Sequence, residues 1–282
     1  MPALDALLDA LRAEPSRTGS VIVTVYGNAV SPRGGEAGLA MLLTVFRAMG
    51  VGDGVVRTAC SRLARDGWLA RRRAGRLSFY RLGPRGLAEF GAADARIYGP
   101  LHRAWDGKLR LAFPQAGEDR SALDTAGFAP AAPGVLASPS PAPPGVLTLL
   151  AEGDPAAMRT FAVRVWPVER LGGSYERFLE RFAPLRSEAA DLTPLRALAA
   201  RVLLIHEYRR VVLHDPVLPM GLLPEAWPGR QARNLCATLY RALLPASEAW
   251  LGSDEAGPLP PPGPALLARF SGGDTPPSAT AW

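Results

Sequence analysis

The spacing of apolar residues predicts amphipathic helices in the first part of the chain. They span residues 3–13, 38–49 and 53–66. In the first range, Leu4, Leu7, Leu8 and Leu11 follow the i, i+3, i+4, i+7 spacing of a helix with one apolar face. In the last range, Val56, Cys60 and Leu63 form such a face, with Asp53 as the expected N-cap and Gly67 as the C-terminal stop.

The β-branched run Ser20–Val30 favours a strand by propensity alone. Its place in the chain favours a helix instead. After the helix at residues 53–66, a strand begins at Trp68–Ala70, a basic turn follows, and a second strand covers Arg76–Leu82. Helix, helix, glycine-bearing turn, helix and basic hairpin is the order of a winged helix-turn-helix, so we expect Ser20–Val30 to be its first core helix.

The rest of the chain alternates short strand patterns with helices and then becomes helical. The expected strands are Trp105–Phe113, Gly134–Ala137, Val146–Leu150 and Phe161–Trp166; the expected later helices are Asp119–Ala126, Ser174–Phe182, Leu195–Asp215 and Ala232–Leu251. We predict an α+β protein with a winged helix-turn-helix at residues 1–92, a small central α+β domain at residues 100–172 and a helical domain at residues 173–252. Residues 253–282 are rich in Gly and Pro and predict a mostly mobile tail.

Positive charge is concentrated in the first hundred residues. That part holds 14 Lys and Arg against 8 Asp and Glu, whereas residues 101–282 hold 18 of each. Between Arg57 and Arg85 stand nine arginines and one acid, Asp66. Such clustering indicates a polyanionic partner, whereas an isolated run of charge is usually a solvated surface.

The third helix and the hairpin carry the residue types that reading DNA requires. Arginine, serine and threonine side chains reach base edges and phosphates, while the opposite helix face docks on the protein. The candidate DNA-binding residues are Arg57, Thr58, Ser61, Arg62, Arg65, Arg71, Arg72, Arg73 and Arg76. The expected partner is an operator in double-stranded DNA.

Three blocks of sequence resemble the PaaX family of repressors. They are SVIVTVYGNAVSPRGGE (Ser20–Glu36), VRTACSRLARDGWL (Val56–Leu69) and LLIHEYRRVVLHDPVLPMGLLPEAWPG (Leu203–Gly229). The resemblance covers residues 18 to 251 and implies a homodimeric repressor of aromatic-acid catabolism. It implies release from the operator by an aryl-CoA thioester such as phenylacetyl-CoA. It also implies that the central domain is ferredoxin-like.

The third block holds the remaining candidates for chemistry, and three interpretations compete. The block is a buried polar cluster, an acyl-CoA effector pocket, or a metal or hydrolytic site. The effector candidates are His206, Tyr208, Arg209, Arg210, His214 and Trp227. The enzyme alternative is a thioesterase or metal-dependent hydrolase that uses His206, Glu207 and His214, although neither HExxH nor another metal-ligand spacing occurs.

Composition narrows the class of protein. The sequence contains no apolar stretch long enough to span a membrane and no signal-peptide pattern. Its two cysteines, Cys60 and Cys236, are too few for a disulfide framework. We therefore expect a cytoplasmic protein. The resemblance to a repressor family implies that it is not an enzyme, and we expect no cofactor.

Overall fold

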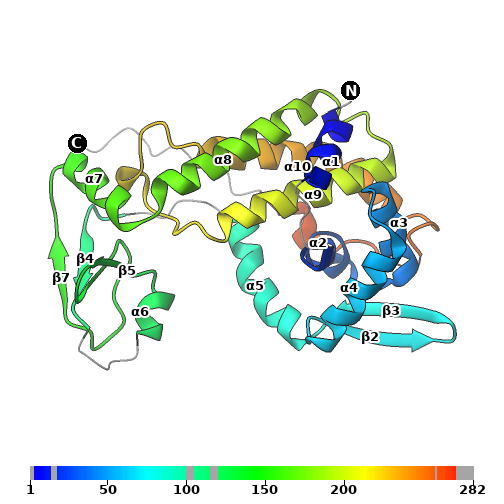
Figure 1. Cartoon of the computed structure of the whole chain (residues 1–282), viewed down its shortest axis with the longest axis horizontal. Helices are drawn as coiled ribbons and strands as arrows, with labels where there is room; N and C mark the ends of the chain where they lie inside the picture. The colour runs from blue at the N-terminus through cyan, green and yellow to red at the C-terminus, as the bar shows by residue number, and fades with distance from the viewer. Residues whose placement is uncertain (1–2, 14–17, 100–104, 115–119, 258, 271–282) are drawn as a thin grey trace. The chain divides into compact units, whose positions relative to one another are not determined.

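The chain is a mixed helix and sheet protein in which helices predominate (Figure 1). The computed structural model describes residues 3–13, 18–99, 105–114, 120–257 and 259–270. Within these ranges no helix is long and apolar enough to cross a membrane. The chain divides into two compact units, and each is described by itself. Unit 1 comprises Met1–Gly99, Arg177–Leu213 and Gln231–Gly273, and unit 2 comprises Pro100–Glu176, His214–Arg230 and Asp274–Trp282.

The N-terminal part of unit 1 confirms the predicted order of helices and hairpin. Its helices are α1 (Ala3–Ala13), α2 (Thr18–Val25), η1 (Tyr26–Val30), η2 (Ser31–Arg33), α3 (Leu39–Ala48), α4 (Asp53–Arg65) and α5 (Pro84–Tyr98). Its strands are β1 (Glu36–Gly38), β2 (Leu69–Ala74) and β3 (Leu77–Leu82). The strands form an antiparallel sheet in the order β1-β3-β2, so the short β1 extends the hairpin.

The run Ser20–Val30 is helical, as the order of elements predicted. α2 packs on α4 and on α9 (Pro194–Val212), and the five residues of the π-helix η1 are all buried. β-Branched side chains surrounded by other helices gain enough burial to offset their weak helix propensity. Tertiary packing therefore decides the conformation of this segment.

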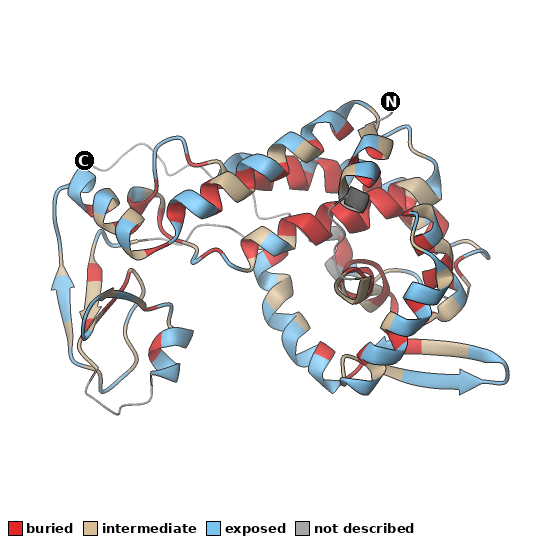
Figure 2. Cartoon of the chain, in the orientation of Figure 1, coloured by how far each residue is buried: buried red, intermediate tan, exposed pale blue. Residues whose placement is uncertain are grey.

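The later helices of unit 1 form its core. α9 is buried along most of its length, and Figure 2 shows it largely in the colour for buried residues. η3 (Ala183–Ser187) and α11 (Pro264–Leu267) belong to the same unit. α8 (Val168–Phe182) and α10 (Gly229–Leu251) each continue from one unit into the other.

Unit 2 contains a four-stranded antiparallel sheet in the order β5-β6-β4-β7. Its strands are β4 (Leu109–Ala112), β5 (Ala129–Ala132), β6 (Val135–Ser138) and β7 (Thr148–Ala151), and its helices are α6 (Ser121–Thr125), α7 (Pro155–Val165) and η4 (Met220–Leu222). Ala112, Leu123, Phe128 and Leu136 form a small core between the sheet and α6.

Two expectations fail in these regions. The strand predicted at Phe161–Trp166 is wrong, because these residues lie at the end of α7 and just beyond it. Asp154 caps that helix by accepting hydrogen bonds from the backbone N–H groups of Ala156 and Ala157 at 2.9 and 3.1 Å. The mobile tail is also wrong for residues 259–270, which include α11 and the buried Leu266 and Phe270. Residues 271–282 lie outside the described residues.

Candidate nucleic-acid interface

The predicted DNA-reading helix, α4, has one buried and one exposed face. Val56, Cys60 and Leu63 are buried against the rest of unit 1. Burial raises the pKa of the Cys60 thiol to about 11, which keeps this side chain uncharged and suited to packing. The exposed face holds all five candidates: Arg57, Thr58, Ser61, Arg62 and Arg65. The helical spacing therefore separates the docking residues from the candidate contact residues.

The two ends of α4 are fixed by different local features. The N-cap is Gly52 rather than the predicted Asp53, which is the first helical residue. The Asp53 carboxylate instead accepts a hydrogen bond from Nε of Arg47 on α3 at 2.7 Å, which ties the two helices together. At the other end, Gly67 adopts a φ of 76°, a left-handed conformation that glycine reaches without steric cost. The predicted stop is thus confirmed.

The hairpin exposes four predicted arginines beside α4: Arg71, Arg72, Arg73 and Arg76. Arg71 donates a hydrogen bond to Ser78 Oγ at 2.7 Å across the two strands. Arg72 lies over the Phe79 ring at 4.7 Å and forms an ion pair with Glu36 on β1, which lowers the pKa of that carboxyl. Arg73 and Arg76 lie near the hairpin turn, where Gly75 has a φ of 58°. Figure 1 shows the hairpin extending away from the helices of its unit.

Two apolar side chains on this surface were not expected from the sequence. Val55 on α4 is 53% exposed, and Leu77 at the start of β3 is 61% exposed. The helical spacing of α4 shows that Val55 is exposed, because it does not belong to the buried series at 56, 60 and 63. A methyl-bearing side chain among hydroxyls and guanidinium groups can contact the methyl group of thymine.

The candidate effector residues belong to both units. His206, Tyr208, Arg209 and Arg210 lie on α9 in unit 1, whereas His214 and Trp227 lie in unit 2. His206 Nδ1 lies 3.0 Å from Thr24 Oγ1, and Arg209 donates to Ser20 Oγ at 2.6 Å, so both link α9 to α2. Burial, with Arg209 and Arg210 nearby, lowers the pKa of His206 to about 3. The His206 ring is therefore neutral at physiological pH.

The other members of the third block make specific contacts as well. In unit 2, Tyr175 donates to Asp215 Oδ2 at 2.7 Å, and the Tyr175 ring packs edge-on against Trp227 with centroids 5.6 Å apart. In unit 1, Glu207 forms ion pairs with Arg210 at 3.1 Å and Arg181 at 3.8 Å. Among the described residues, no group of three or more His, Cys, Asp or Glu side chains is placed to hold a metal ion.

A cavity of about 660 Å³ lies in unit 1 next to the basic surface. Its walls come from α3, the end of α4 that carries Arg57, the hairpin, and the segment around residues 254–260. Charged residues at its walls include Arg57, Arg76 and Asp254, and its apolar residues include Leu43 and Phe79. None of the six effector candidates lines this cavity.

The fold and this surface define an α+β protein with a basic face built from a helix and a hairpin. Two family descriptions match it: "PaaX-like protein" over residues 17–86 and "PaaX-like protein C-terminal domain" over residues 166–253. The transcriptional repressor PaaX of Escherichia coli (strain K12) is 39% identical over an alignment of 304 positions, which covers 96% of each chain. The chain belongs to the PaaX-like family.

A solved structure shares the fold at lower sequence identity. It is the uncharacterized protein Rv0674 from Mycobacterium tuberculosis, with a TM-score of 0.53 and 23% identity. The match covers 82% of this chain and 97% of that chain. The fold is therefore shared by proteins whose sequences have diverged widely.

Proposed function

We propose that the chain is a transcriptional repressor that binds operator DNA through α4 and the β2–β3 hairpin. The observation that carries the proposal is the exposed row of arginine and hydroxyl side chains on α4, with the opposite face buried. The order α2, β1, α3, α4, β2, β3 and the sheet order β1-β3-β2 support a winged helix-turn-helix. The name of the Escherichia coli relative agrees with this function.

In this proposal, α4 enters the major groove and the hairpin contacts the phosphate backbone. Arg57, Thr58, Ser61, Arg62 and Arg65 read base edges, and the hairpin arginines Arg71, Arg72, Arg73 and Arg76 release counterions from neighbouring phosphates. An exposed cluster of like charges is unfavourable in water and becomes favourable beside a polyanion. A second possibility is a protein–protein adaptor whose arginines meet an acidic partner, and it predicts weak DNA binding without sequence preference.

We propose that the effector is an aryl-CoA thioester such as phenylacetyl-CoA, as the resemblance to PaaX repressors implies. The six candidates of the third block remain one prediction for its site. The cavity beside Arg57 offers a second placement, because a ligand there would engage an arginine that the operator also needs. Ala40 is exposed and lines that cavity, so Ala40→Trp fills it without disturbing the core. Arg210 is exposed on α9, so Arg210→Ala tests the first placement.

We also propose a homodimer in which the β7 edge of the unit 2 sheet contacts a second copy. Leu147, Leu149 and Leu150 are 67%, 55% and 61% exposed, and Leu149 and Leu150 point to opposite sides of the edge strand β7. An exposed apolar edge strand is a site for pairing with another chain. The strand order β5-β6-β4-β7 with antiparallel neighbours supports a ferredoxin-like sheet in this unit. Leu149→Glu should convert dimer to monomer in analytical ultracentrifugation, and an unchanged mass would count against this interface.

The experiment that tests the function is a binding measurement on DNA from upstream of the gene and its neighbours, with and without phenylacetyl-CoA. Specific binding that the thioester releases supports both repressor and effector class. Specific binding that ignores the thioester supports the repressor and rejects this effector. Absence of sequence-specific binding rejects the repressor. The same release experiment is repeated with Ala40→Trp and with Arg210→Ala. If Ala40→Trp stays on DNA in the presence of the thioester, the effector binds in the cavity; if Arg210→Ala does, it binds at the third block.

A further inference from the structure

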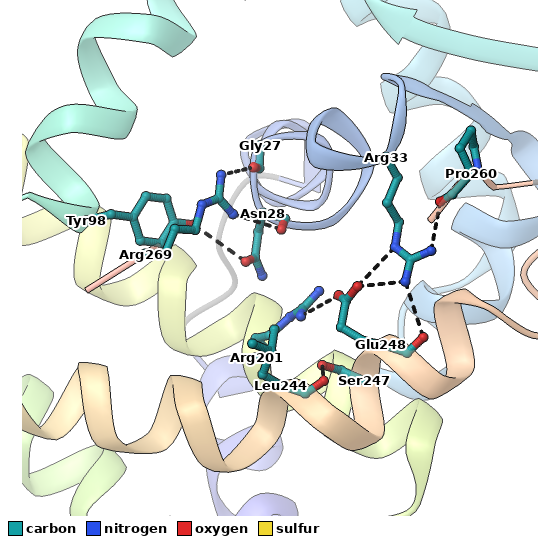
Figure 3. Close-up of polar contacts among 10 residues, drawn as sticks. All are labelled: Gly27, Asn28, Arg33, Tyr98, Arg201, Leu244, Ser247, Glu248, Pro260 and Arg269. Atoms are coloured by element: carbon teal, nitrogen blue, oxygen red, sulfur yellow. Dashed lines mark hydrogen bonds and ion pairs between the residues drawn. The ribbon is translucent and has the colours of Figure 1, made fainter. Parts of the chain in front are cut away.

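A partly buried carboxylate in unit 1 holds two buried arginines from different parts of the chain. Glu248 on α10 accepts from Arg33 of η2 through Oε2 at 2.6 Å and from Arg201 of α9 through Oε1 at 2.7 Å (Figure 3). Arg33 is nearly saturated, because it also donates to the carbonyl oxygens of Pro260 and Glu248. Arg201 is 0% exposed. One carboxylate therefore balances two buried guanidinium groups.

A third buried arginine lies in the same region. Arg269 donates to the carbonyl oxygens of Gly27 and Asn28 in the π-helix η1 and to Asp94 at 2.8 Å. Its guanidinium also lies over the Tyr98 ring at 4.0 Å. The Tyr98 hydroxyl in turn donates to Asn28 Oδ1 at 3.5 Å. Burial raises the pKa of Tyr98, and the charge of Arg201 is close enough to oppose that rise. Asn28, Tyr98 and Arg201 therefore belong to one buried neighbourhood, consistent with the packing of η1 on α9.

This neighbourhood has an excess of positive charge and of hydrogen-bond donors. Arg33, Arg201 and Arg269 face the two carboxylates Glu248 and Asp94. Among the described residues, the buried Nε and Nη2 of Arg201 and Nδ2 of Asn28 find no hydrogen-bond acceptor. In Figure 3 the amide nitrogen of Asn28 and the guanidinium of Arg201 point toward the same space. A buried donor that makes no hydrogen bond costs about 1–3 kcal/mol. We therefore expect an acceptor between these groups.

We propose that the buried donors of Arg201 and Asn28 bind a compact monovalent anion such as chloride. An anion accepts hydrogen bonds from all these donors and neutralises the remaining positive charge. A water molecule would need acceptors for its own hydrogens. The nearby carboxylate and carbonyl oxygens each already accept one hydrogen bond: both Glu248 oxygens from arginines, the Asn28 carbonyl oxygen from Arg269, and Asn28 Oδ1 from Tyr98. A water molecule would also leave the excess positive charge of the three arginines uncompensated. The site lies in the interior of unit 1 and is independent of the proposed DNA binding.

The test measures thermal unfolding of the full chain at constant ionic strength. Chloride or bromide replaces gluconate, and gluconate is the reference because it is too large for a buried site. Chloride should raise the unfolding midpoint in a saturable way, by roughly 5 °C when its concentration is a hundred times its dissociation constant. Identical unfolding curves in gluconate and chloride would overturn the proposal and leave a water molecule as the acceptor. Crystals grown in bromide give a check without mutation. An anomalous peak between Arg201 and Asn28 supports the site, and peaks at the surface alone contradict it.

Two variants remove the anion dependence by different means. Asn28→Asp places a carboxylate where the anion would bind, and it keeps the oxygen that accepts from Tyr98, so chloride should no longer raise the midpoint. Arg201→Met removes the donors and should also abolish the chloride effect. Arg186→Ala removes an exposed arginine of η3 and is the matched control, which should keep the full chloride effect. Retention of the chloride effect in Asn28→Asp would show that the ion binds elsewhere.

Discussion

Arginines of the same unit occupy two opposite settings. Those of α4 and the hairpin are exposed and crowd one another, whereas Arg33, Arg201 and Arg269 are buried and hold carboxylates and carbonyl oxygens. Removing one partner of a buried ion pair destabilises the folded state, because the groups that it bonded stay in the interior with fewer partners. An exposed cluster contributes little to folding and gains its favourable energy from a partner. Substitutions in the two settings should therefore change different measured quantities.

The largest expected effect is on stability, from the buried setting. Arg33→Met removes the guanidinium that bonds Glu248 and the Pro260 carbonyl, so it weakens the attachment of the segment after α10 to η2. Glu248 keeps its ion pair with Arg201, so the variant loses hydrogen bonds rather than the last counter-charge. We expect the free energy of unfolding to fall by roughly 1.5–3 kcal/mol in urea titrations. The exposed Arg73→Ala, as the control, should stay within about 0.5 kcal/mol of the wild type. If the two variants have the same free energy of unfolding, the buried arginines do not contribute more to stability than the exposed ones.

The exposed setting should give the reverse result. Arg57→Ala and Arg62→Ala should each weaken operator binding by roughly 1–3 kcal/mol at fixed salt, with unchanged urea unfolding. Arg76→Ala should weaken binding to all sequences alike and reduce the dependence of affinity on salt. Arg186→Ala, on an exposed arginine outside this surface, is the control. Wild-type operator affinity in both α4 variants would show that α4 does not read the DNA.

The part of the fold that we propose to face DNA could be predicted because its signals are local. The helix at residues 53–66 and the hairpin follow from periodicity, from Gly67 and from the charge cluster, and the structure agrees with each to within a few residues. The helix at Ser20–Val30 could be predicted only from the order of the elements around it. Its propensity favours a strand, and packing on α4 and α9 makes it helical. The contacts of the predicted arginines with DNA remain a prediction.

The first error arose from a local helix start that the interpretation overlooked, and the others arose where distant residues decide the structure. Phe161–Trp166 has strand-like composition, but Asp154 caps a helix that begins at Pro155 and buries Met158 and Ala162 on one side. The Gly- and Pro-rich segment after residue 253 looked mobile because composition does not show that Arg33 and Arg241 bond its carbonyl oxygens at Pro260 and Phe270. No local pattern identified Arg33, Arg201 and Arg269 as buried, since each depends on a partner far away in sequence.

The buried His206 should make the free energy of unfolding depend on pH. The folded pKa of His206 is lowered to about 3 from an ordinary value of 6.5, so between these values the unfolded chain binds the extra proton. Its contribution to stability is full above pH 6.5 and falls as the pH drops, by roughly 1.4 kcal/mol per pH unit at most. Urea unfolding between pH 7 and 4 should show that the wild type loses stability more steeply than His206→Gln. The variant keeps the carboxylates, so its pH dependence is the reference. If the wild type and His206→Gln lose stability in parallel, His206 does not contribute in this way.

The smallest expected effect sharpens the description of the exposed surface. Among the described residues of α4, Val55 is the one large apolar residue that is mostly exposed, and it lies in the first turn, at the end that enters the groove in helix-turn-helix proteins. If it contacts a thymine, replacing operator thymines one at a time by deoxyuridine should weaken binding at one position by about 0.8 kcal/mol, the value of one buried methyl group. Val55→Ala should remove that difference, because the side chain no longer reaches the methyl group, while Leu77→Ala on the hairpin should keep it. Uniform binding of the wild type to all deoxyuridine operators would leave the α4 arginines as the base-reading residues and make Val55 a passive surface position.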